Sequence, residues 1–76
     1  TTIYPNPFKE TVTLKYGKQV GSLKIFNVIG EQIKSLELSP NNDKTVIDFG
    51  GIPSGIYFIR TYKEGTLVET KKIIKA

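Results

Sequence analysis

Carboxylates are the side chains in this sequence with the greatest potential for acid-base chemistry, because the chain has no histidine and no cysteine. It therefore lacks the usual general base near neutral pH, a thiolate nucleophile and any zinc site of the cysteine type. A hydrolase of the glycosidase kind needs two paired carboxylates. The acids Asp43, Asp48, Glu64 and Glu69 instead fall on different predicted turns and strands with no motif joining them. The sequence predicts a protein that is not an enzyme and that uses no metal or other cofactor.

Lysine is the commonest charged residue. The chain has eleven lysines and arginines against seven acids, a net charge of +4, which favours acidic partners by long-range attraction. The lysines are spread from Lys9 to Lys75 at alternate positions of strand-like runs, which is typical of a solvated sheet face. No basic cluster or aromatic platform motif accompanies them, so we expect no nucleic-acid partner.

The length of 76 residues predicts a single domain with a thin core, because a chain this short buries only about 60% of its unfolded surface. No apolar run approaches the roughly 20 residues of a membrane-spanning helix, so we expect no membrane insertion. The chain begins at Thr1 without the pattern of a secretion signal. We therefore expect it to be a piece of a longer protein.

Alternating polar and apolar residues predict six or seven short strands and no helix. The apolar residues Val12, Leu14 and Tyr16 share one face of the first clear strand. In the second strand the alternation slips at residues 26–28, where we expect a bulge or a strand end. The fold class predicted is all-β, an immunoglobulin-like or fibronectin-like antiparallel β-sandwich. The clear strands are residues 11–16, 20–28, 32–38, 45–49, 56–62 and 67–74.

Turns and apolar runs predict how these strands are arranged. A Gly30-Glu31 tip and residues 63–66 indicate two antiparallel hairpins. Residues 56–62 are the most β-prone run, and their apolar character on both faces predicts a central strand buried on both sides, with Tyr57 and Ile59 in the core. Gly30 and Gly55 are expected to adopt positive φ angles.

The N-terminal residues 1–9 are expected to form an extended, proline-rich segment. Pro5 and Pro7 lack backbone donors and cannot pair within a sheet interior, so we expect a stiff approach to the fold with Tyr4 or Phe8 packed on the edge of the sandwich. A role in recognition, or as a spacer after a cleavage site, is the alternative.

Three segments together are similar to the type A C-terminal sorting domains of the type IX (Por) secretion system of Bacteroidetes. They are residues 3–8, 23–31 and 52–60, and their order and spacing match those of the family across essentially the whole chain. Glu31 and Ile52 stand where the family often has lysine and leucine. The residues that match the sorting-signal motifs are Tyr4, Pro5, Asn6, Pro7, Gly30, Pro53, Gly55 and Tyr57.

The resemblance implies that residues 1–76 are a single C-terminal sorting domain fused behind an N-terminal cargo. The cargo would pass through the periplasm, be recognised by the type IX translocon and reach the cell surface or the medium, where a surface peptidase would remove the domain. The resemblance also implies a translocon-docking strand, although an ordinary edge strand protected by lysines stays open as an alternative. The docking residues implied are Lys71, Lys72, Ile73, Ile74 and Lys75.

A second function class stays open from the residues alone. An accessory carbohydrate-binding or adhesive module of a surface enzyme would present exposed aromatic side chains as stacking platforms. The candidates are Tyr4, Phe8, Tyr16 and Tyr62.

Overall fold

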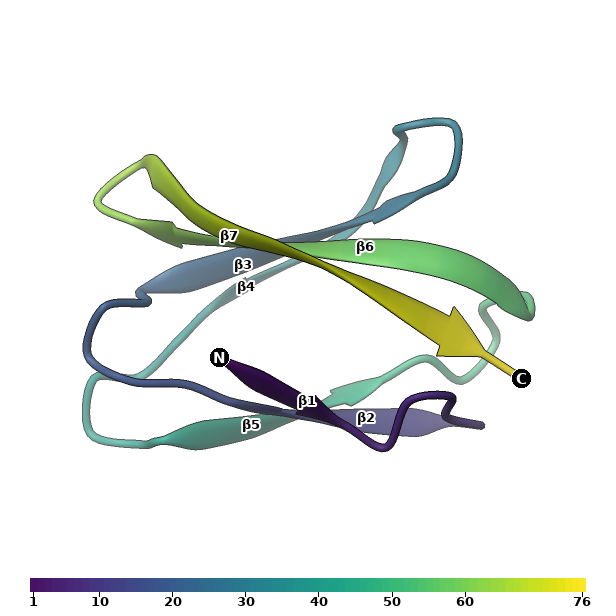
Figure 1. The fold of residues 1–76 in the computed structure, drawn as a ribbon, viewed down its shortest axis with the longest axis horizontal. Helices are drawn as coiled ribbons and strands as arrows, with labels where there is room; N and C mark the ends of the chain where they lie inside the picture. The colour runs from purple at the N-terminus through teal and green to yellow at the C-terminus, as the bar shows by residue number, and fades with distance from the viewer.

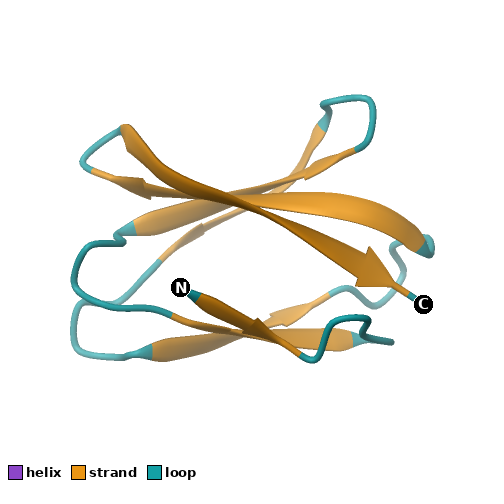
Figure 2. Cartoon of the chain, viewed as in Figure 1, coloured by secondary structure: helices purple, strands orange, loops and turns teal.

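Seven strands and no helix make up the computed structural model, which describes residues 1–76. They form two antiparallel sheets that face each other, one ordered β1-β2-β5 and the other β4-β3-β6-β7 (Figure 1). Figure 2 shows the connecting loops gathered at the two ends of the sandwich. The predicted all-β sandwich is confirmed. The strands are β1 (Thr2–Tyr4), β2 (Thr11–Lys15), β3 (Ser22–Asn27), β4 (Gln32–Glu37), β5 (Lys44–Asp48), β6 (Gly55–Lys63) and β7 (Thr66–Lys75).

The core lies between the sheets and follows the period-two alternation of the strands. Val12 of β2 is paired with Ile47 of β5, and Ile25 of β3 with Ile59 of β6, so that each pair points into the same layer. Thirteen buried apolar residues form one cluster, and the predicted inward positions of the first clear strand and of β6 are confirmed. The cluster is Phe8, Val12, Leu14, Tyr16, Val20, Leu23, Ile25, Leu38, Ile47, Phe49, Tyr57, Ile59 and Ile73.

Both predicted hairpins are present, since β3 pairs antiparallel with β4 and β6 with β7. The expected irregularity in β3 is a register shift between Ile25 and Phe26 opposite β4. The β3–β4 turn is closed by Asn27, whose side-chain Oδ1 accepts hydrogen bonds from the backbone N–H groups of Ile29 and Glu31. Gly30 has the positive φ of 87° that this turn requires.

The burial predicted for β6 needs one correction. The strand is an interior strand of its sheet, as expected, but its outer face is not covered, because each sheet of a two-layer sandwich buries only one face. Ile56 is 39% exposed, Phe58 is half-buried and Arg60 is exposed. The apolar side chains on the second face of β6 therefore lie at the surface.

The chain forms no helix that is long and apolar enough to cross a membrane.

Candidate functional site

Three segments far apart in the sequence meet around the end of β7, at the end of the sandwich where the C-terminus lies (Figure 1). Hydrogen bonds join residues 6–8, which follow β1, to residues 72–76. Further hydrogen bonds join residues 75–76 to the loop between β5 and β6. We call residues 4–8, 49–57 and 72–76 the C-terminal corner. It contains all the sorting-motif residues that the sequence predicts except Gly30.

Asn6 completes the open edge of β7 with its side chain. Its Oδ1 accepts a hydrogen bond from the backbone N–H of Ile74 at 3.0 Å, and its Nδ2 donates to the carbonyl of Lys72 at 3.2 Å. The side-chain amide thus presents an acceptor and a donor, as a neighbouring strand would. An edge strand has a row of unpaired backbone groups, and Asn6 pairs part of that row.

The backbone of Phe8 also pairs with the open edge of β7. Its N–H donates to the carbonyl of Ile74 at 3.0 Å, and its carbonyl accepts from the N–H of Ala76 at 2.7 Å. These bonds form a parallel bridge between Phe8 and Lys75. The last residues of the chain are therefore paired on both sides, by β6 on one and by the N-terminal segment on the other.

The two prolines explain why this segment leaves β1. Within residues 1–9 the chain is paired with β2 over Thr2–Tyr4, and it then bends at Pro5, Asn6 and Pro7. Proline has no backbone N–H and cannot continue a sheet ladder, so β1 stops at the residue before Pro5. The bend carries Asn6 across to β7 in the other sheet. Phe8, not the 43% exposed Tyr4, packs into the core.

Three aromatic rings lie under the corner. The ring centroids of Phe8 and Phe49 are 4.8 Å apart and those of Phe49 and Tyr57 are 5.4 Å apart, both edge to face, an arrangement that aromatic pairs prefer. Tyr57 is buried except for its rim, where its hydroxyl donates to the carbonyl of Pro53. The predicted core position of Tyr57, with its hydroxyl at the rim, is confirmed.

The loop before β6 is tied to the last two residues of the chain. The ammonium of Lys75 donates to the carbonyl of Phe49 at 2.7 Å and also to the carbonyl of Ile52. The hydroxyl of Ser54 donates to the carbonyl of Ala76 at 3.0 Å. Gly55 opens β6 with a φ of 150°, a conformation that favours glycine. Residues 6–8 and the loop before β6 therefore both hold residues 72–76 in place.

A family model described as the secretion system C-terminal sorting domain matches residues 2–76. The chain belongs to this family. The match runs from the first residue of β1 to beyond the last residue of β7, so it covers both sheets. It confirms the resemblance to the sorting domains of type IX secretion, a family of sorting signals rather than of catalysts. A comparison with curated proteins gave no match.

The docking residues expected on β7 of this sorting domain differ sharply in accessibility. Ile73 is fully buried, so its side chain contacts no partner while the domain is folded. Lys75 is half-buried and its ammonium is held by backbone carbonyls. Lys72 is exposed and Ile74 is 38% exposed. The side chains of Ile73 and Lys75 therefore stabilise the C-terminal corner.

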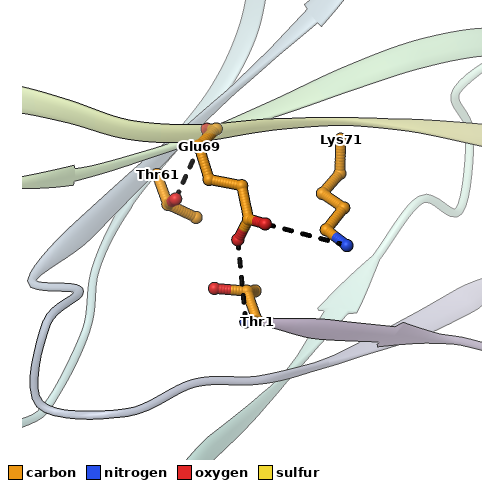
Figure 3. A network of polar contacts seen from close by, with 4 residues as sticks. All are labelled: Thr1, Thr61, Glu69 and Lys71. Carbon is orange, nitrogen blue, oxygen red and sulfur yellow. Dashed lines mark hydrogen bonds and ion pairs between the residues drawn. The ribbon is translucent and has the colours of Figure 1, made fainter.

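Lys71 belongs to a small polar network on the inward side of β7 (Figure 3). Glu69 lies between the Lys71 ammonium, at 3.7 Å, and the amino group of Thr1, at 3.6 Å. In residues 1–76 on their own, the side chain of Thr1, together with its amino group and Lys71, holds the pKa of Glu69 below its ordinary value of 4.5, against the opposing effect of burial. The hydroxyl of Thr61 donates to the backbone carbonyl of Glu69 at 3.4 Å.

Gly30 lies outside the C-terminal corner of the sorting domain. Its N–H donates to the carbonyl of Asn27 within the β3–β4 turn. Its role in the structure is to let this turn close.

The sequence did not predict the contact of Asn6 with β7 or the ring cluster of Phe8 with Phe49. One signal for Asn6 was available, because a polar residue between two prolines is flanked by positions that have no N–H to donate. Its side chain is then the group able to supply a donor to a neighbouring strand.

Proposed function

We propose that this sorting domain directs a fused N-terminal cargo from the periplasm through the outer membrane by way of the type IX translocon. The observation that carries the proposal is the family match over residues 2–76. The geometry supports it, because the C-terminal end of the chain has a fixed shape held by two other segments. A strand held in one conformation is a surface that a translocon can recognise without first ordering it.

The proposed docking residues in the folded domain are Lys72 and Ile74 on the outward side of β7, and Lys71 on its inward side. Ile73 and Lys75 contribute indirectly, by holding β7 in place. The sorting-motif residues Asn6, Pro53 and Tyr57 of the corner contribute in the same indirect way, through the contacts described above.

Residues 1–76 are proposed to act as one unit, which a surface peptidase then removes from the exported cargo. Cleavage before β1 fits this arrangement, because Thr2–Tyr4 are paired with β2 and peptidases act on segments that are not held in a sheet. The cargo would then be left at the cell surface or in the medium.

The accessory carbohydrate-binding alternative receives little support from the aromatic side chains. Phe8 and Tyr16 are buried, and the Tyr16 hydroxyl donates to the carbonyl of Ser39. Tyr4 and Tyr62 are more accessible but belong to different sheets. They cannot form one stacking platform.

A fusion tests the proposal. A fluorescent protein with a periplasmic signal peptide, followed by residues 1–76, is produced in a bacterium that has type IX secretion, with the same cargo lacking the domain as control. The cargo with the domain should reach the surface or medium in a shortened form, and terminal sequencing should place the cut before Thr2. Retention of the intact fusion in the periplasm would contradict the proposal.

A further inference from the structure

The outward side of β3, β6 and β7 brings aromatic and cationic residues together, although they are scattered in the sequence. Phe26, Phe58 and Lys72 are paired across the three strands, and the next row holds Lys24 and Arg60. Paired residues of neighbouring strands share one face of a sheet. Tyr62 lies one row further on. We call this side of the three strands the outer face.

The charge of the outer face is positive without compensation. Lys24, Arg60 and Lys72 form no ion pair, since the salt bridges of the protein involve Glu69 on the other side of β7. No outward position of the three strands carries an acid. Glu37, on the edge strand β4 opposite Ser22, is the acid of this sheet that points to the same side. The face therefore favours an acidic partner.

The cations of the outer face rest on its aromatic rings. The guanidinium carbon of Arg60 lies 5.0 Å from the ring centroid of Phe26, and the ammonium of Lys24 lies 5.3 Å from that of Tyr62. These are cation–π distances. Stacking a nucleobase or a sugar on these two rings would require the cations to be displaced.

Apolar residues extend this face toward the C-terminus. Ile56 and Ile74 are paired beside the aromatic row and are 39% and 38% exposed, and a shallow hollow lies between Phe26, Phe58 and Arg60. Aromatic and arginine side chains with an apolar surround and a cationic rim are the composition of a protein–protein interface.

We propose that the outer face docks an acidic protein surface of the secretion machinery. The inference rests on the proposed function and extends it, because the recognised surface includes β3 and β6 as well as the end of β7. Lys72 and Ile74 then act as the β7 part of a wider patch. The cations favour a partner surface with negative charge. The aromatic and aliphatic side chains supply the apolar area that is removed from water on binding.

Two matched triple variants test the surface. Lys24→Gln, Ile56→Thr and Lys72→Gln alter the outer face. The control changes Lys15→Gln, Lys44→Gln and Val46→Thr, which lie on the outward side of the other sheet. Each triple removes two lysines and one exposed aliphatic side chain, so both have the same net charge. Melting by circular dichroism checks both folds, and the double variant Lys24→Gln with Lys72→Gln serves if the first triple melts early.

Export of the fluorescent cargo is the first readout. The outer-face triple should lower export about tenfold, equivalent to about 1.4 kcal/mol of docking free energy, whereas the control triple should export like the wild type. Equal export by both triples, with normal export by the wild-type domain, would overturn this inference and leave the proposed function standing. Retention of the wild-type fusion would overturn both.

Binding to defined probes identifies the chemistry of the partner. Fluorescence anisotropy of the labelled domain is measured with poly-L-glutamate, oligodeoxythymidine and polygalacturonate at low and high salt. We expect poly-L-glutamate to bind with an affinity that falls as salt rises and that the Lys24→Gln, Lys72→Gln variant loses. Tighter binding of the oligonucleotide or of the acidic polysaccharide would overturn the assignment to a protein partner.

Discussion

Replacing Asn6 by alanine should loosen the end of β7 without disturbing the core. The change removes one acceptor for the Ile74 N–H and one donor to the Lys72 carbonyl, both at the surface. A typical intramolecular hydrogen bond contributes about 0.5–1.5 kcal/mol net. Because water can replace both partners here, we expect a total loss near the low end, about 1 kcal/mol. In a domain of this size that lowers the melting midpoint by about 4–8 °C.

The loss should be local as well as global. Hydrogen exchange at the Ile74 amide should accelerate about fivefold, the factor that corresponds to 1 kcal/mol. The Asn6→Asp variant keeps the acceptor and loses the donor, so it should preserve more of the protection at Ile74. Asn42→Ala is the matched control, because Asn42 is exposed and its side chain makes no hydrogen bond. It should change stability by less than about 0.5 kcal/mol.

Urea denaturation and amide exchange measured on the three variants decide the question. An Asn6→Ala variant with a normal midpoint and normal exchange at Ile74 would refute the idea that the Asn6 side chain stabilises the open edge of β7. The motif would then have to be explained by recognition alone.

Three further changes test the core, the corner and the ion pairs. Ile59→Ala should lower the free energy of unfolding by about 2–5 kcal/mol because Ile59 is fully buried, and an unchanged urea midpoint would show that the inward face is wrong. Lys75→Met removes a charged donor from two carbonyls and should lower the free energy of unfolding by about 1–3 kcal/mol. The exposed control Lys44→Met should be nearly neutral, and equal effects of the two changes would contradict the stabilising role of the Lys75 ammonium. Glu69 has a pKa below 4.5 in the folded protein, so its stabilising contribution is present above its unfolded pKa and is lost as the pH falls through the folded value. In residues 1–76 expressed alone, Glu69→Gln should therefore show a smaller fall of melting midpoint between about pH 6 and pH 3 than the wild type, and parallel curves would speak against this linkage.

The local structure of the sandwich follows from short-range sequence patterns. The inward positions of β2 and β6 come from period-two alternation, and Gly30 marks the β3–β4 turn because a positive φ suits glycine. The slip in alternation after Ile25 is the observed bulge. Each of these features depends on neighbours only a few residues away.

The contacts that build the corner and the outer face depend on topology. Asn6 meets Ile74 across 68 residues, and Phe26 lies beside Phe58 only because β3 pairs with β6. Turn patterns specify the two hairpins, but no local pattern specifies that β3 pairs with β6 or that Asn6 lies beside β7. The burial of Thr61 was not predicted either. Its polar side chain is buried, and its hydroxyl donates to a carbonyl of β7. The contact of Asn6 with β7 and the pairing of β3 with β6 join segments that are far apart in the chain.

The surface fraction of a fluorescent cargo fused to residues 1–76 tests the central claim most directly. It is measured in two strains of a bacterium with type IX secretion, one intact and one lacking the outer-membrane translocon. We predict that the intact strain carries most of the fused cargo to its surface or medium and that the second strain keeps it in the periplasm. Equal distribution of the folded fusion in the two strains would contradict the account of this domain as a type IX sorting signal.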